Sequence, residues 1–203
     1  DVGGSPRNIA ATDDAVWVTD FDGARVVRVD PGTNTVVAEV AVGNDPFKVD
    51  ATDDQVWVTN NGDDTVTRID PATNQVVETV PVGGGPQVVL IADGSVWVSN
   101  VDDGTVSRID PDTNEVVSEI AIGTEASGLA FEAGALWVVV TGEGKVVAVD
   151  PDSEAIVAEV AVGDRPIGAA TGAGAVWVTN TSSDTVSRID GQGAFAGEAI
   201  PRR

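Results

Sequence analysis

The chain has 203 residues, of which 42% are apolar, so it is long enough to bury a core and too apolar to be disordered. Its net charge of −22 repels nucleic-acid phosphates and anionic lipids, and no run approaches the ~20 apolar residues of a membrane helix. The composition therefore argues against nucleic-acid binding and membrane insertion. Cysteine and histidine are both absent, which excludes disulfides, zinc–thiolate sites and nucleophilic triads in their usual forms.

The sequence repeats itself every 40 residues, and its five segments align without an insertion. Each segment carries Gly at its third position, and four of the five carry Pro at the sixth. A fixed period of this length is typical of repeat architectures and predicts one domain over residues 1–203. The predicted units span residues 1–40, 41–80, 81–120, 121–160 and 161–200.

Within the third unit, four short apolar runs follow one another, separated by turn residues. The runs are PQVVLI at 86–91, SVWVSN at 95–100, TVSRID at 105–110 and EVVSEIAI at 115–122. They are rich in β-branched residues, are bounded by Gly, Pro, Asp or Asn, and show no helical period. Four antiparallel strands per unit predict an all-β fold, a β-propeller of five four-stranded blades.

The second run of each unit contains the tryptophan of that unit. Its VWV pattern is apolar at consecutive positions, which indicates a strand buried on both faces between two blades. We therefore interpret the tryptophans as core residues that fill the space between blades, each burying about 150–250 Å². They are Trp17, Trp57, Trp97, Trp137 and Trp177.

Two other columns of the repeat have structural explanations. The IDPxTN segments combine residues that favour turns, because Pro presets φ and Asn tolerates the left-handed region. An arginine precedes the Asp of this motif by two residues in four units, and we expect its stem to cover the sheet and its guanidinium to pair with carboxylates. These residues are Arg28, Arg68, Arg108 and Arg188.

The combination of VGxxP, VWVTN, TVSRIDP and TN followed by VV resembles the YVTN-type β-propeller repeat, with Trp in place of the usual Tyr. The resemblance covers all five units and is weakest at Val139–Val140 and at residues 191–200. It implies mostly non-enzymatic proteins at the cell surface or outside the cytoplasm. The related streptogramin-lyase propellers depend on a catalytic histidine, so that activity does not carry over to a chain without one.

The family commonly has seven blades, so five units leave three arrangements open. Five blades close alone, they belong to a larger ring, or several chains complete one ring by self-association. The near-identical units also fit a purely structural surface repeat or an engineered symmetric propeller. The sequence alone does not choose among these arrangements.

Departures from the repeat mark candidate ligand-binding residues at the mouth of the channel. Loops that enter the first strand and loops that join the second and third strands are expected to share one face. On that face, aromatic and charged side chains interrupt the repeat and fit a small polar ligand or a peptide loop. The candidates are Arg7, Phe21, Phe47, Lys48 and Asp50, with Glu125, Asp164 and Arg165 expected opposite them.

The sequence favours a non-enzymatic binding, scaffold or sensor module with no cofactor. Acidic loops at 20–23, 60–64 and 100–104 offer oxygen ligands for Ca²⁺, although Asp and Gly are also ordinary hairpin residues. The alternative function is a carbohydrate-active enzyme that uses paired carboxylates or Ca²⁺. No catalytic residue is assigned.

Overall fold

The structure, a computed structural model, describes residues 2–191, and its regular secondary structure is almost entirely β-strand. A single 3-10 turn, Thr141–Glu143, is the only helical element in this range. None of the described residues forms a helix with the length and apolarity needed to cross a membrane. The all-β prediction is confirmed.

The strands form five antiparallel sheets, called blades 1–5 in chain order, and each blade follows the order of the chain. Four blades have four strands, and blade 5 has three within the described range. The fourth strand predicted for the last unit lies outside the described residues.

Blade 1 is β1 (Pro6–Ala11), β2 (Val16–Asp20), β3 (Arg25–Asp30) and β4 (Thr35–Ala41). Blade 2 is β5 (Pro46–Ala51), β6 (Val56–Asn60), β7 (Thr65–Asp70) and β8 (Gln75–Pro81). Blade 3 is β9 (Pro86–Ala92), β10 (Ser95–Asn100), β11 (Thr105–Asp110) and β12 (Glu115–Ala121). Blade 4 is β13 (Ala126–Glu132), β14 (Ala135–Val140), β15 (Lys145–Val149) and β16 (Ile156–Ala161). Blade 5 is β17 (Pro166–Gly172), β18 (Ala175–Asn180) and β19 (Thr185–Asp190).

The predicted strands of the third unit agree with β9–β12 to within one residue at each end. The turns between strands 3 and 4 also form as expected. Asn34, Asn74 and Asn114 each adopt a left-handed φ of 56–59°, and the N–H of each donates to the carbonyl of the Asp four residues earlier. The IDPxTN motif is thus a turn motif.

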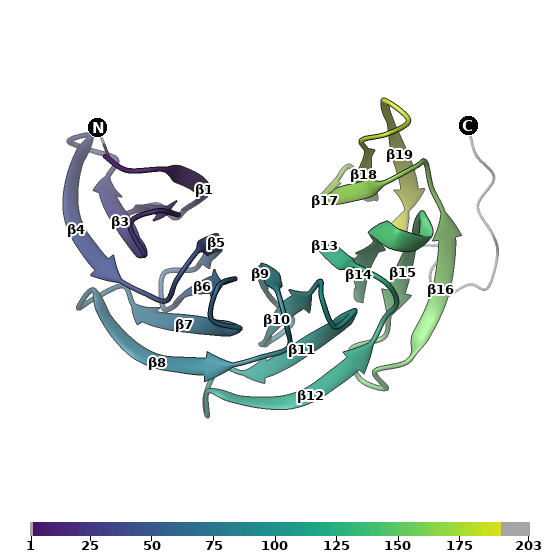
Figure 1. The fold of residues 1–203 in the computed structure, drawn as a ribbon, viewed down its shortest axis with the longest axis horizontal. Coiled ribbons are helices and arrows are strands. Elements are labelled where there is room, and N and C mark those ends of the chain that lie inside the picture. The colour runs from purple at the N-terminus through teal and green to yellow at the C-terminus, as the bar shows by residue number, and fades with distance from the viewer. Residues whose placement is uncertain (1, 192–203) are drawn as a thin grey trace. The chain divides into compact units, whose positions relative to one another are not determined.

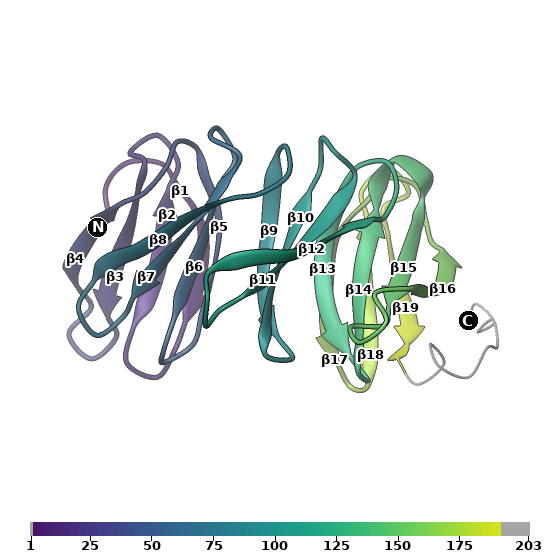
Figure 2. The same cartoon turned by 90° about the horizontal axis from the view of Figure 1, so that it is seen from below.

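The chain forms two compact parts. The first part comprises Asp1–Val98 and Ser107–Ser118, and the second comprises Ser99–Val106 and Glu119–Arg203. In the first part, β5 contacts both β1 and β9, so the first strands of blades 1–3 are neighbours (Figure 1). In the second part, β13 contacts β17 in the same way. In each part the strands run between two faces made of loops (Figure 2).

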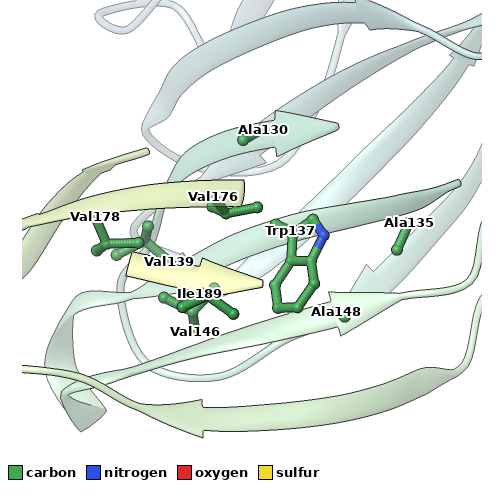
Figure 3. Close-up of a cluster of buried hydrophobic side chains, with 9 residues drawn as sticks. All are labelled: Ala130, Ala135, Trp137, Val139, Val146, Ala148, Val176, Val178 and Ile189. Atoms are coloured by element: carbon green, nitrogen blue, oxygen red, sulfur yellow. The ribbon is translucent and has the colours of Figure 1, made fainter. Parts of the chain in front are cut away.

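Tryptophan packing joins successive blades within each part. Trp17 of blade 1 lies in a cluster with Val49, Val56 and Ile69 of blade 2. Trp57 repeats this arrangement on blade 3, and Trp137 repeats it on blade 5. Figure 3 shows Trp137 beside Val176 and Ile189. The prediction that the tryptophan packs on the next blade is therefore confirmed for these three residues, and Trp97 is buried as well.

Trp177 does not follow the prediction that every tryptophan belongs to the core. Its side chain is 39% exposed, whereas the other four are at most 1% exposed. The reason is its place in the chain: Trp17, Trp57 and Trp137 are each covered by the blade that follows, whereas Trp177 lies on the last described blade. Its indole N–H still donates to the carbonyl of Gly172 at 3.0 Å, the same kind of bond that Trp97 and Trp137 make.

The repeated arginines also join blades, but by hydrogen bonds different from those expected. Arg28 donates through Nη1 to the carbonyl of Pro71 at 2.6 Å and to Oδ1 of Asn74 at 2.9 Å. Arg68 makes the equivalent bonds to Pro111 and Asn114. The pKa values of the expected carboxylates, Asp30 and Asp70, are lowered by hydrogen bonds within their own turns and then by charge attraction to the two arginines, but the hydrogen bonds of the arginines go to turn oxygens. Each guanidinium instead binds the turn of the next blade and lies over the tryptophan of its own blade.

Candidate ligand-binding face

One loop face of each part combines the loop before the first strand with the hairpin between the second and third strands. Backbone hydrogen bonds join these loops within a blade, from Phe21 N to Ser5 O at 3.0 Å and from Asn61 N to Asp45 O at 3.1 Å. Thr141 and Thr181 make the equivalent bonds to Glu125 and Arg165. The two loops of blades 1, 2, 4 and 5 therefore share a face, as the sequence predicted.

Arg7 lies between two aromatic rings on this face of the first part. The centre of its guanidinium is 4.6 Å from the ring centroid of Phe21 and 4.0 Å from that of Phe47. Phe21 comes from the β2–β3 hairpin of blade 1, and Phe47 comes from β5 of blade 2. Both rings are half-buried while Arg7 is exposed. Two cation–π contacts fix the plane of the guanidinium and leave its edge available to solvent.

Two further candidates, Lys48 and Asp50, follow Phe47 on β5. Lys48 is half-buried, and its backbone N–H donates to the hydroxyl of Thr59 at 2.9 Å. Asp50 accepts hydrogen bonds from the backbone N–H groups of Ile91, at 2.8 Å, and Ala51, at 3.0 Å. Asp50 therefore joins β5 to β9 of the next blade, which is a structural role.

Several cations among the described residues are occupied elsewhere. Arg25 binds Asp20 and Glu39, Lys145 binds Glu143 and Glu159, and Arg108 donates to Ser95. Within residues 2–191, the side chains of Arg7 and Lys48 have neither a hydrogen bond nor an ion pair. In a chain with a net charge of −22, an unpaired guanidinium held between two aromatic rings forms a distinct local environment.

The remaining three candidates belong to the second part. Glu125 lines a cavity of about 630 Å³, together with residues of the 101–104 hairpin that include Asp102 and Asp103. Asp164 and Arg165 are exposed in the loop before β17, where the carbonyl of Arg165 also accepts a hydrogen bond from the Thr181 hydroxyl at 2.9 Å. The expectation that these three residues face Arg7 across a channel stays a prediction.

Carboxylates of the acidic loops hold the loops together. Asp63 accepts hydrogen bonds from the backbone and side-chain nitrogens of Asn44, at 2.7 and 2.8 Å, and these bonds lower its pKa. Asp64 accepts from the N–H of Gly85 at 2.9 Å. Among the described residues, no three His, Cys, Asp or Glu side chains are arranged to hold a metal ion. The prediction of a Ca²⁺ site therefore gains no support from a ligand cluster in residues 2–191.

In blade 1 the carboxylate that holds the loops together is Asp20, which is buried. It accepts from Ser5 N at 2.8 Å, from Nε of Arg25 at 2.8 Å and from Gly23 N at 3.3 Å. The hydrogen bond from Ser5, followed by those from Arg25 and Gly23, lowers the pKa of Asp20 against the opposing effect of burial. Asp20 thereby holds the loop next to Arg7 in place.

Blade 4 lacks the Thr-Asn pair of the motif but retains its hydrogen bond to the following blade. In blades 1 and 2 the hydroxyls of Thr19 and Thr59 donate to the carbonyl of a β-strand residue in the next blade. Val139 occupies this position in blade 4, and Ser127 of β13 supplies the hydroxyl, with the Ile167 carbonyl at 3.4 Å. Sequence reasoning noted Val139 but missed Ser127, although a small hydroxyl residue is unusual in a column that otherwise holds Arg, Phe, Gln and Ile.

Comparison with known proteins places the chain in a family. The model of the virginiamycin B lyase family matches residues 2–203, so the chain belongs to that family. This agrees with the predicted resemblance to streptogramin-lyase-like propellers and with the β-propeller fold. A comparison with curated proteins finds no match.

Solved structures share the fold at low sequence identity. Virginiamycin B lyase from Staphylococcus aureus has a TM-score of 0.81 at 17% identity, over 91% of this chain and 66% of that chain. A catalytically inactive histidine-to-alanine variant of the same enzyme, with quinupristin, has a TM-score of 0.79 at 18% identity, over 93% and 67%. Hydrazine synthase from Kuenenia stuttgartiensis has a TM-score of 0.76 at 18% identity, over 92% and 66%. The chain thus spans about two thirds of the length of these proteins, and at these identities the likeness shows the fold alone.

Proposed function

We propose that this chain is a non-catalytic binding module of the β-propeller type. Its ligand would bind at the loop face of blades 1 and 2, where the stack of Arg7 between Phe21 and Phe47 carries the proposal. A guanidinium held flat between two rings keeps its N–H edge ready for a carboxylate, with little loss of side-chain entropy on binding. The rings offer an apolar surface to the rest of the ligand. In keeping with the family resemblance, we propose that the module acts outside the cytoplasm.

The chemistry of the face indicates the class of ligand. Arg7 and Lys48 are cations without an ion-pair partner among the described residues, so the face suits a small molecule or peptide end that carries a carboxylate and a flat apolar group. Binding through these groups needs neither a metal nor a cofactor. The strongly acidic surface elsewhere would repel the same ligand, which confines binding to this face.

A lyase activity is the competing function, because the family includes virginiamycin B lyase. Two observations weigh against it for this chain. Its 203 residues contain no histidine, and the S. aureus enzyme is described as catalytically inactive when one of its histidines is replaced by alanine.

A matched pair of probes tests the proposed ligand class. N-acetyl-L-phenylalanine carries a carboxylate and a ring, whereas its primary amide keeps the ring and loses the charge. Titration followed by NMR at about 0.15 M salt should show the acid binding more tightly than the amide. Arg7→Gln should weaken binding of the acid about tenfold or more, since hydrogen bonds to charged groups contribute about 1.5–3 kcal/mol.

Arg188→Gln is the matched control for this titration. It removes the same charge from an exposed arginine that lies over a single ring, Trp177, and is not a candidate for ligand binding. The proposal expects binding of the acid to be unchanged in this variant. Equal affinity of wild type and Arg7→Gln for the acid would contradict the proposal.

A further inference from the structure

The first described blade and the last expose complementary halves of one interface. Inside each compact part, a blade presents a tryptophan and a valine of its third strand to the next blade, as Trp17 and Val26 do to blade 2. Blade 5 carries the same two residues as Trp177 and Val186, which are 39% and 60% exposed. Trp17 and Val26 are fully buried. Blade 5 therefore exposes the face that, in blade 1, packs on the following blade.

Blade 1 exposes the opposite surface. In blades 2 and 3 the residue that receives the tryptophan on the first strand is Val49 or Val89, each 1% exposed. The equivalent residue in blade 1, Ile9, is 60% exposed. Val16 and Val18 are only half-buried, whereas Val56 and Val58 are fully buried in blade 2. Blade 1 thus lacks the apolar cover that blades 2 and 3 receive.

The polar groups of the two exposed faces are also complementary, and they occupy equivalent positions of the repeat. Arg188 lies over Trp177, 5.8 Å from its ring centroid, as Arg28 lies over Trp17. Arg28 binds the Pro71 carbonyl and Asn74 of the next blade, but residues 2–191 provide no hydrogen-bond acceptor for Arg188. The equivalent turn of blade 1, from Pro31 to Asn34, is exposed, whereas Pro71 is buried. The exposed turn thus offers the acceptors that Arg188 lacks.

We infer that copies of this chain associate head to tail, with blade 5 of one copy covering blade 1 of the next. The occupant of each exposed face is therefore a second copy. The contact reproduces an interface that the chain already makes between its own blades: Trp177 packs on Ile9, Val16 and Val18, and Arg188 binds the turn at Pro31–Asn34. Because the two faces differ, the association is heterologous, and it builds closed rings or open filaments.

The charge of the chain sets the salt dependence of this association. Copies with a net charge of −22 repel one another, while the contact itself is apolar. Raising the salt concentration from about 0.05 to 0.5 M screens the repulsion and should strengthen the association.

Two variants, each blocking one face, test the inference. Ile9→Asp places a charge on blade 1 and keeps the blade 5 face intact, and Trp177→Glu does the reverse. Analytical ultracentrifugation should show wild type as larger than its monomer mass of 20.7 kDa, and each variant alone as a monomer. An equimolar mixture of the two variants should form a dimer that grows no further, because each variant supplies the face that the other has lost.

Val77→Asp is the control variant. Val77 is 48% exposed on the outer strand of blade 2, where blades 1, 3 and 4 also expose a valine, so this change should leave the wild-type assembly intact. Circular dichroism checks that every variant is folded. A monomeric wild type, or a mixture of the two blocked variants that stays monomeric, overturns the inference and favours closure of the two faces within one chain.

Discussion

Nη1 of Arg68 donates a hydrogen bond to Oδ1 of Asn114 at 2.7 Å and thereby joins the third strand of blade 2 to a turn of blade 3. The same nitrogen binds the Pro111 carbonyl, and the guanidinium is 5.6 Å from the ring centroid of Trp57. One side chain thus connects the core tryptophan of its own blade to the backbone of the next. Arg28 and Arg68 thus stabilise the packing of successive blades.

Replacing Arg68 by lysine should destabilise the chain although the charge is kept. Lysine lacks the planar guanidinium that reaches two oxygens while lying over an indole, so we expect a loss of about 1–2 kcal/mol in the free energy of unfolding. Urea denaturation followed by tryptophan fluorescence measures this loss. Arg165→Lys, at an exposed site, is the control and should change the free energy of unfolding by less than about 0.5 kcal/mol. Equal losses in the two variants would argue against a role of Arg68 between blades.

Tryptophans in identical sequence contexts should contribute unequally to stability. Trp57→Ala removes a fully buried side chain and should cost about 3–5 kcal/mol in the free energy of unfolding. Trp177→Ala should cost less than half of that, because 39% of its side chain is already exposed. Thermal unfolding at low protein concentration compares the two variants. A Trp177→Ala variant as unstable as Trp57→Ala would show that blade 5 is covered by another part of the chain.

The buried carboxylate of Asp20 makes the free energy of unfolding depend on pH. Its pKa is lowered in the folded protein, so it stabilises the fold above the ordinary carboxyl range and loses this effect as pH falls through its folded pKa. Asp20→Asn should cost about 1–3 kcal/mol at pH 7, because the amide N–H groups would face the donors of Arg25. The difference between wild type and variant should shrink at pH values below the ordinary carboxyl pKa of about 4.

A pair of compensating changes tests this explanation of Asp20. In blades 2 and 5 an asparagine at this position donates to the hydroxyl of a threonine, Thr65 or Thr185, where blade 1 has Arg25. Combining Asp20→Asn with Arg25→Thr should therefore recover much of the stability that the single change loses. If the double variant is less stable than Asp20→Asn alone, the compensation is wrong.

A hydroxyl group introduced on the neighbouring strand β14 should take over the role of the Ser127 hydroxyl. Ser127→Ala removes the hydrogen bond to the Ile167 carbonyl and the contact with Thr141 Oγ1 at 2.7 Å, and we expect a loss of about 1 kcal/mol. Adding Val139→Thr restores a hydroxyl at the position that Thr59 occupies in blade 2, and it should recover part of the loss. Chemical denaturation of both variants measures this coupling, and the absence of any recovery would contradict it.

The repeat allowed the strands to be predicted because local sequence and packing agree in every blade. The VWVTN at 56–60 and the VWVTN at 176–180 are identical, and both form the second strand of a blade. Trp57 is nevertheless fully buried and Trp177 is not. Burial is decided by the next blade, which the local sequence does not contain. The exposure of the end faces was therefore beyond local inference.

The candidate site was predictable in composition but not in geometry. Phe21, Phe47 and Arg7 each depart from the repeat, which identified them as candidates. Their mutual stacking depends on a hairpin of blade 1 reaching the first strand of blade 2, a contact between residues far apart in sequence. Asp50 also departs from the repeat, yet it binds the backbone of Ile91 and serves the fold. Departure from a repeat thus identifies local differences, and only the contacts separate ligand binding from structural compensation.

The most direct test of binding without catalysis is to incubate the chain with quinupristin, the molecule present in the structure of the S. aureus relative. Chromatography measures the quinupristin that remains, with an active virginiamycin B lyase as the positive control. We predict that quinupristin stays intact at protein concentrations and times at which the control consumes it. Loss of quinupristin in proportion to the concentration of this chain would contradict the account and identify the chain as an enzyme.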